Sequence, residues 1–444
     1  MKRLIITVIS LLVLSGCTST KTEPVTEIVD EKKNVIVLNG TTATLNNQTI
    51  KEYDYVWHID TDSEDEYYTG NKPESDDIYI AHDIIYYPEV SKESFSIEEY
   101  DGEMEWVTHY SSEELSDYLF GTLPVLGAEL PTEMMHSEEE AYNNPVLHIN
   151  KAGEYILEGN WNGQVAIDLG EEAFEDEKAK VTIILDGVNV SCSVAPSIVF
   201  YSVYESDYTW EDREEYNNEI DVSDAGATVI INDGTENNFT GANVYRLLKP
   251  VYKKEGSTVQ KKRYKMDGSF YSYESLLIKG EEKGTGILNI TSTTYEGLDS
   301  ELHMQIDSGN INIVSNDDGI NVNEDNVSVF KMNGGRLTIF AGQGEEGDVI
   351  DSNGYIVVEG GTLLGTSPSV SDDILDSEKG SEVSDNATVI SGGKANADYE
   401  GGFMPQGMPG GFDPNNRPED FGLGGFAGMP MNGQEPPEKP EGQR

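Results

Sequence analysis

Basic side chains are scarce in this sequence. Its 444 residues include 29 Lys and Arg against 82 Asp and Glu, so the formal net charge is −53. Because proteins that bind nucleic acids use Lys and Arg to neutralise phosphates, this balance excludes DNA and RNA as partners. Electrostatic docking on anionic lipid headgroups is excluded for the same reason. A chain this acidic instead attracts cations, above all hard ions that bind oxygen ligands.

Histidines, cysteines and known catalytic motifs are also few. The six histidines show no paired zinc spacing, and the Gly-x-Ser-x-Gly, P-loop and dinucleotide-binding motifs are missing. Asp60, Asp62 and Glu64 begin like an EF-hand loop, but Asp65 stands where that loop requires glycine. Cys192 lies in an apolar run without basic neighbours, so we expect a small core residue rather than a reactive thiol.

Long apolar runs are missing as well, and the longest one stands at the N-terminus. Lys2-Arg3 precedes the apolar run Leu4–Leu14, which has the length of a signal peptide and is too short for a membrane span of about 20 residues. The run ends in Leu14-Ser15-Gly16-Cys17, which resembles the lipobox of bacterial lipoproteins. This resemblance implies a signal peptide over 1–16, a lipid on Cys17 and a location on the extracellular face of the membrane. The alternative is an ordinary secretory signal with an incidental cysteine.

Short β-branched segments bounded by Gly, Asn or Asp fill much of the chain, which is the pattern of strands and tight turns. One strand is predicted over Val181–Leu185, with a turn at Asp186-Gly187 and a second strand over Val188–Val190. Further predicted strands are Thr228–Ile231, Ile287–Ile290, Asn310–Val314, Leu337–Phe340 and Tyr355–Val358. The sequence therefore predicts an all-β fold.

A repeat lies between residues 284 and 392. Four segments each read acid, spacer, Leu or Ile, then Asp or Asn, and their starts are separated by 22, 30 and 25 residues. These segments are Glu296–Asp299, Asp318–Asn321, Asp348–Asp351 and Asp373–Asp376. Glycine turns recur between them, so the period is that of a solenoid, and the missing helical and leucine-rich patterns favour a parallel β-helix. The alternative is a set of chance turn signals in an acidic, glycine-rich chain.

Stacking the four repeats produces two columns of polar side chains on one face of the β-helix. The first column is Glu296, Asp318, Asp348 and Asp373, and the second is Asp299, Asn321, Asp351 and Asp376. Carboxylates spaced about 4.8 Å apart, the distance between coils, repel one another unless a cation lies between them. Ca²⁺ accepts such flexible oxygen ligands more readily than Mg²⁺ does. We therefore predict Ca²⁺ between the coils; the alternative is that these acids cap turns and face water.

Several segments interrupt the repeat pattern. The predicted β-helix covers 35–51 and 146–394, after a tether over 17–34, and an insertion rich in Tyr and acids covers 52–145. The aromatic residues of this insertion could form its own core or a platform on which sugar rings stack. A basic cluster lies at 253–265. The Gly/Met/Pro-rich tail over 395–444 is predicted to be disordered.

Together these motifs resemble a bacterial family of carbohydrate-binding, calcium-binding β-helix surface proteins of the clostridial pectin-binding type. The resemblance rests on Gly284–Ile290, Asp317–Asn321, Gly347–Gly354 and Gly360-Gly361-Thr362, and on upstream elements such as Ile149–Gly159. It implies a right-handed parallel β-helix, similar in fold to pectate lyases, with Ca²⁺ between coils and binding of acidic polysaccharide without catalysis. This chain departs from the family pattern at Val349 and Ile374, which replace the repeat glycine.

Three functions are compatible with these features. The first is a monomeric, lipid-anchored surface protein that binds polygalacturonate-like polysaccharide through Ca²⁺ and is not an enzyme. The second is a Ca²⁺-dependent polysaccharide lyase, for which His303 and Lys331 are the basic residues that could abstract a proton. The third is an adhesin or scaffold that contacts its partners through 52–145.

Overall fold

The computed structural model describes residues 33–60, 66–73, 76–89, 135–207, 218–244, 266–342, 347–367 and 373–393. The chain divides into two units, Met1–Met404 and Pro405–Arg444, and all described residues belong to the first. The predicted signal peptide, the acylated Cys17 and the tail over 395–444 lie outside the described ranges.

The regular secondary structure of the described part of the chain is almost entirely strand, so the prediction of an all-β fold is confirmed. Its helical segments are short, namely α3 (Glu138–Tyr142) and a 3-10 turn over Ala173–Glu175. Ser137 and Glu140 form a capping box that begins α3. Within these ranges no helix combines the length and apolar character needed to cross a membrane.

One group of strands forms an eleven-stranded sheet in the order β26-β23-β20-β17-β14-β11-β9-β7-β6-β4-β5. From β7 to β26 every neighbouring pair is parallel. The strands are β4 (Glu52–Ile59), β5 (Glu66–Thr69), β6 (Ile78–His82), β7 (Val146–Ile149), β9 (Gln164–Asp168), β11 (Ile198–Ser202), β14 (Gly268–Ser272), β17 (Glu296–Ser300), β20 (Ile320–Val322), β23 (Ile350–Ser352) and β26 (Asp376–Ser377).

The other strands join in a nearly closed, barrel-like sheet. It begins with an antiparallel hairpin, β1-β2-β3, and from β12 on each strand pairs in parallel with the strand three positions later in the chain. The strands are β1 (Asn34–Gly40), β2 (Thr42–Leu45), β3 (Gln48–Thr49), β8 (Gly153–Asn162), β10 (Val181–Ser191), β12 (Ala227–Ile231), β13 (Glu236–Gly241), β15 (Leu276–Gly280), β16 (Ile287–Ser292), β18 (Met304–Ile306), β19 (Asn310–Val314), β21 (Val329–Met332), β22 (Arg336–Phe340), β24 (Tyr355–Val358), β25 (Gly361–Ser367), β27 (Gly380–Val383) and β28 (Ala387–Gly393).

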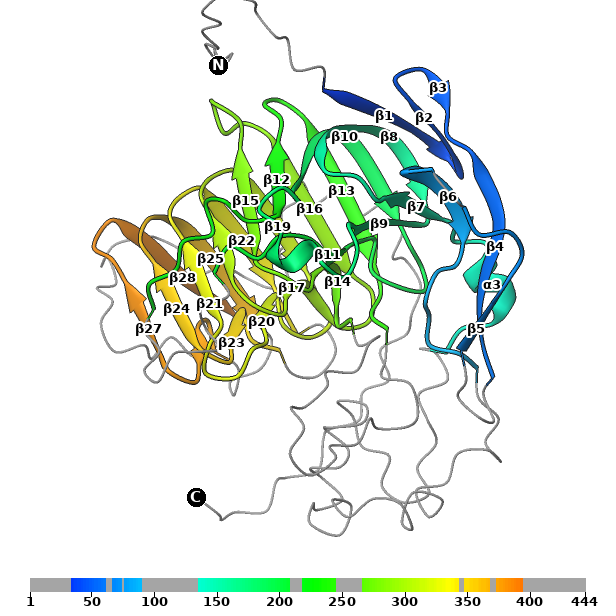
Figure 1. Cartoon of the computed structure of the whole chain (residues 1–444). Coiled ribbons are helices and arrows are strands. Elements are labelled where there is room, and N and C mark those ends of the chain that lie inside the picture. The colour runs from blue at the N-terminus through cyan, green and yellow to red at the C-terminus, as the bar shows by residue number, and fades with distance from the viewer. Residues whose placement is uncertain are drawn as a thin grey trace, which may run out of the picture. The chain divides into compact units, whose positions relative to one another are not determined.

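Along the chain, strands of the two sheets alternate in a fixed order. From β11 to β28 each segment of chain supplies one strand to the eleven-stranded sheet and then two strands to the barrel-like sheet. We call such a segment a coil. Figure 1 shows the strands of successive coils lying side by side from β12 to β27.

The predicted turn at Asp186-Gly187 is wrong, because β10 continues through it as one strand. The first half of β10 pairs with β12 and the second half with β13, and the register shifts between Leu185 and Val188. Gly187 has a φ of +76°, a conformation that glycine adopts without strain. The Asp-Gly pair therefore forms a bulge that carries the strand from one stack to the next.

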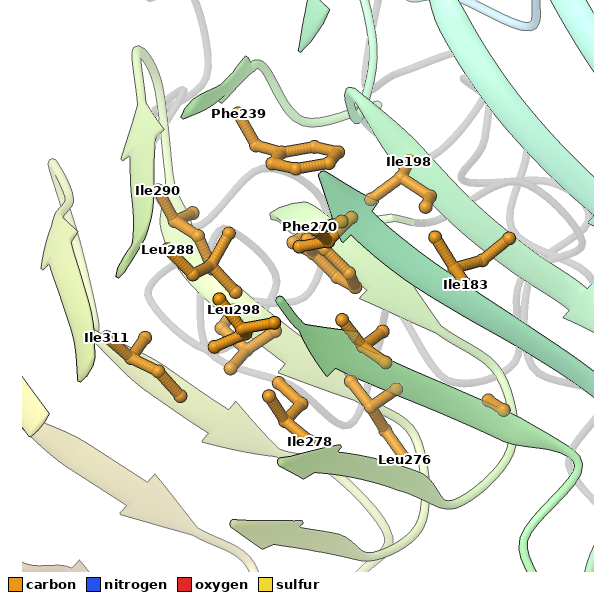
Figure 2. Packing of buried hydrophobic residues seen from close by; sticks show 14 of the residues in the cluster. Ile183, Ile198, Phe239, Phe270, Leu276, Ile278, Leu288, Ile290, Leu298 and Ile311 are labelled. Carbon is orange, nitrogen blue, oxygen red and sulfur yellow. The ribbon is translucent and has the colours of Figure 1, made fainter. Parts of the chain in front are cut away.

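The core lies between the strand stacks and is built from side chains that repeat at one position in every coil. Phe270, Leu298, Ile320 and Ile350 are neighbours in register across β14, β17, β20 and β23, and none of them is exposed. Figure 2 shows Phe270 and Leu298 packing beside the inward side chains of neighbouring strands. The predicted inward stacking of the repeated Leu or Ile is thus confirmed for these coils.

Cys192 is buried in a second apolar cluster, on the opposite face of the eleven-stranded sheet from the core. Burial raises the pKa of its thiol to about 12, which keeps the thiol protonated at neutral pH. The prediction of a small, unreactive core residue is confirmed.

The departure from the repeat glycine at Val349 has a compensating change on the facing strand. A Cβ at Gly297 would lie 2.3 Å from Cγ2 of Ile313, and a Cβ at Gly319 would lie 2.2 Å from Cγ2 of Ile339. In the next coil Val349 fills this position, and the residue in register with Ile339 is Gly365. The glycine has therefore changed sides, and the pair keeps one glycine and one β-branched residue, with valine one methylene smaller than isoleucine.

This exchange predicts that Gly365→Ile destabilises the protein while Val349→Gly/Gly365→Ile largely restores stability. A Cβ at Gly365 would lie 2.6 Å from Cγ1 of Val349, and overpacking of this kind costs about 1–3 kcal/mol. In the double variant the coil regains the Gly–Ile pair of its neighbours. Urea unfolding of the single and double variants measures the recovery; additive losses in the double variant would contradict the exchange.

A column of asparagines runs along the outer side of the barrel-like sheet. Asn160, Asn189, Asn238, Asn289 and Asn312 are neighbours in register, and each Nδ2 donates to Oδ1 of the preceding asparagine at 2.6–3.0 Å. These bonds connect five successive strands through side chains. In the sequence these asparagines begin the triplets Asn-Trp-Asn, Asn-Val-Ser, Asn-Phe-Thr, Asn-Ile-Thr and Asn-Ile-Val, whose alignment depends on the coil register.

The described strands between residues 52 and 82 continue the eleven-stranded sheet. β6 pairs antiparallel with β7, β4 pairs parallel with β6, and β5 closes the edge as an antiparallel neighbour of β4. This part of the predicted insertion therefore adds strands to the sheet that carries the acidic repeats.

Candidate cation site

The second predicted column lies in register on one face of the eleven-stranded sheet. Asp299 on β17 pairs with Asn321 on β20, which pairs with Asp351 on β23, which pairs with Asp376 on β26. Because side chains alternate along a strand, these residues face away from the core that receives Leu298 and Ile320. Burial falls along the column: Asp299 is fully buried, Asn321 is 8% exposed, Asp351 is half-buried and Asp376 is exposed.

The first predicted column divides into two parts. Oδ1 of Asp318 accepts the backbone N–H of Asp348 at 2.7 Å, and Oδ1 of Asp348 accepts the N–H of Asp373 at 2.5 Å. These two carboxylates therefore connect adjacent coils by capping turns, which was the alternative to metal binding. Glu296, the first member of the column, is buried, at 4% exposed.

Glu296 belongs to a cluster of three buried carboxylates. Asp267, Glu296 and Asp299 each offer one oxygen, and these oxygens lie within 4.8 Å of one another. Gly268, next to Asp267, pairs with Glu296, so Asp267 stands one coil before the repeats that the sequence revealed. The sequence contains an acid-Gly pair at Asp267-Gly268, but residues 245–265 separate this pair from the preceding coil, and the repeat predicted between residues 284 and 392 does not include it.

Burial and like charge both act on the carboxyl groups of this face. The pKa of Glu296 is raised well above its usual value, first by burial and then by the charges of Asp267, Asp317, Asp299 and Asp318. Burial and the neighbouring Asp317 raise the pKa of Asp318 in the same way. The pKa of Asp351 is raised to about 6, by burial and by Asp376. Such groups bind a proton or a cation rather than remain as uncompensated anions.

Two buried side-chain oxygens on this face take no part in the hydrogen bonds of the fold. Oε2 of Glu296 and Oδ1 of Asn321 have no hydrogen-bond partner in the part of the chain that the structure describes. Asn321 lies in register with Asp299, one coil after the cluster. A buried oxygen without a donor is unfavourable, whereas a hard cation coordinates such oxygens directly. The residues present thus fit an all-oxygen site for a hard ion such as Ca²⁺.

The two basic residues named for a lyase, His303 and Lys331, lie away from the acidic cluster. His303 is fully buried, and its Nδ1 accepts the backbone N–H of Val329 at 3.1 Å. Lys331 is on β21 of the barrel-like sheet, in register with Gln305 and Val357. Neither residue belongs to the acidic face of the eleven-stranded sheet.

Comparison with known proteins finds a match to a family model. Residues 213–410, a little under half of the chain, match the model of a family described as carbohydrate-binding domain-containing protein. This segment contains Asp267 and all eight predicted ligands. No curated protein matches the chain.

Among solved structures, a polysaccharide lyase-like protein from C. thermocellum, determined as a gadolinium derivative, is similar at 21% identity. The match covers 56% of this chain and 86% of that chain, with a TM-score of 0.36. This TM-score is too low to establish a common fold.

Proposed function

We propose that this protein binds acidic polysaccharide, such as polygalacturonate, through Ca²⁺ held on the acidic face of its eleven-stranded sheet, and that it does not cleave the polymer. The observation that carries this proposal is the buried cluster of Asp267, Glu296 and Asp299, with the unpartnered Oε2 of Glu296. The cluster lies inside the segment that matches the carbohydrate-binding family. The parallel pairing of successive coils supports a parallel β-helix as the frame, and the right hand is that of nearly all parallel crossovers.

Charge explains why the cation is central to this function. A face of carboxylates repels a polyuronate, and only a bound cation reverses the local sign. Ca²⁺ takes about six to eight oxygen ligands, so three carboxylates and Oδ1 of Asn321 leave positions for sugar carboxylates and water. Asp351 and Asp376, which are more exposed, lie where the polymer would extend beyond the buried cluster, and there too a cation would have to bridge the like charges.

Binding rather than cleavage is favoured by the roles of the basic residues. A lyase needs a base beside the carbon next to the sugar carboxylate. His303 accepts a backbone N–H inside the fold, and Lys331 lies on another sheet. We further propose that the protein acts as a monomer on the outer surface of the cell, held by a lipid on Cys17, as the sequence Leu14-Ser15-Gly16-Cys17 suggests.

The test uses the chain without residues 1–16 and with Cys17→Ser, so that it stays in solution. Affinity electrophoresis through polygalacturonate should show retardation in CaCl₂ and none in EDTA, while ultraviolet absorbance from unsaturated products stays flat. Retardation that persists in EDTA would overturn the role of Ca²⁺. Absence of retardation in CaCl₂ would overturn the choice of polymer, and rising absorbance would overturn the assignment as a non-enzyme.

A further inference from the structure

We propose a second ligand site, for a neutral pyranose sugar, in a cavity formed by the strands of 52–82 and helix α3. The cavity has a volume of about 340 Å³, within the range of about 300–1,000 Å³ typical of small-molecule sites. Its lining includes His58, His82, Glu138, Glu139 and Tyr142. This site lies outside the segment 213–410 and shares no residue with the acidic cluster.

The surface that would contact the sugar is the exposed ring of Tyr142, whose orientation is fixed by stacking on His82. Tyr142 is 48% exposed, and its ring stacks on His82 with centroids 4.0 Å apart and planes 7° from parallel. Both ring nitrogens of His82 are occupied, Nδ1 by the carbonyl oxygen of Tyr142 at 2.7 Å and Nε2 by Oε1 of Glu52 at 3.0 Å. A fixed aromatic face of this kind stacks on the apolar C–H face of a pyranose without loss of side-chain freedom.

The polar lining selects the kind of sugar. Glu138 and Glu139 carry acceptor oxygens, which match the hydroxyl donors of a sugar. Nδ1 of His58 lies 3.2 Å from Oε1 of Glu138, and its Nε2 lies 2.8 Å from Oγ1 of Thr69, so this wall is also preorganised. Carboxylates at the rim repel a uronate, because two anions at close range are unfavourable. The site should therefore prefer a neutral sugar over the polymer proposed for the acidic face.

A neighbouring tyrosine provides a matched control. Tyr67 is 49% exposed and stacks on His58 at 5.1 Å, so it resembles Tyr142 in exposure and support, but it does not line the cavity. Tyr67→Ala and Tyr142→Ala should therefore remove about the same area of exposed aromatic side chain. Only Tyr142→Ala should lose a sugar contact.

The experiment is isothermal titration of the same soluble chain, without residues 1–16 and with Cys17→Ser, with cellotetraose, xylotetraose, galactotetraose and tetragalacturonate, all in EDTA. We expect at least one neutral tetrasaccharide to bind, about tenfold weaker binding with Tyr142→Ala, and unchanged binding with Tyr67→Ala and with Glu296→Gln. Equal loss in both tyrosine variants, absence of binding by all neutral probes, or preference for tetragalacturonate would overturn the proposal. Because Ca²⁺ is absent, failure here leaves the calcium-dependent function untouched, and the reverse also holds.

Discussion

Glu296→Gln is expected to weaken Ca²⁺ binding at least tenfold while raising the stability of the calcium-free protein. Glutamine keeps the shape of the side chain but removes the buried negative charge that lies beside Asp267 and Asp299. Without the ion, the folded protein must either protonate Glu296 or keep it charged among burial and like charges, and both cost free energy relative to the ionised carboxylate of the unfolded chain, so glutamine stabilises the calcium-free fold. With the ion, one strong ligand is lost.

Thermal unfolding with and without CaCl₂ measures both effects, because an ion that binds only the folded state raises Tm with its concentration. The wild-type protein should gain stability from CaCl₂ and Glu296→Gln should gain much less, from a higher starting Tm. Asp385→Asn removes the same charge from an exposed turn of the last described coil and should leave the calcium response intact. Equal calcium responses in all three proteins would refute the assignment of Glu296 as a ligand.

Asn237→Ala is expected to be the most destabilising single substitution of a polar residue in the described coils, by about 3–5 kcal/mol. Asn237 is fully buried. Its Oδ1 accepts the N–H of Gly187 at 2.9 Å and that of Val188 at 3.0 Å, and its Nδ2 donates to Thr235 and to the carbonyl oxygen of Ile287, each at 3.0 Å. Alanine would leave two N–H groups of the β10 bulge without acceptors, that of Val188 buried and that of Gly187 partly buried.

The control for Asn237 is a member of the asparagine column. Asn189 makes two side-chain hydrogen bonds to Asn160 and Asn238 but is exposed, so Asn189→Ala should cost no more than about 1 kcal/mol. The midpoint of urea unfolding compares the two variants. Similar midpoints would mean that the bulge finds other acceptors, and that Asn237 does not hold the two halves of β10 in place.

Much of the coil register was predictable from local patterns. Each four-residue repeat places its Leu or Ile next to an Asp or Asn, and side chains alternate along a strand. The pattern therefore predicts that the aliphatic residues lie on one face of the strand and the polar residues on the other. The aliphatic residues are Leu298, Ile320 and Ile350, and the polar residues are Asp299, Asn321 and Asp351. The strands over Thr228–Ile231, Asn310–Val314 and Leu337–Phe340 could be located in the same way. These features depend on residues close together in the chain, which is why a single sequence reveals them.

Other features depend on contacts between distant residues. Asp267 joins Glu296 and Asp299 only through the pairing of β14 with β17, and the backbone register that aligns Gly268 with Glu296 has no local signature. The continuation of β10 through Asp186-Gly187 likewise needs Asn237, about 50 residues away, because a local Asp-Gly signal fits a turn as well as a bulge.

Composition and local periodicity thus determined that this chain is acidic, all-β and coiled with its repeated aliphatic residues inward. Tertiary structure decided which acids are buried together, which cap turns, and which strand receives the glycine of each Gly–Ile pair. The physical reason is that solvent exclusion and steric fit are properties of neighbours in space. Asp299 and Asp376 have the same place in the repeat, yet one is fully buried and the other is exposed.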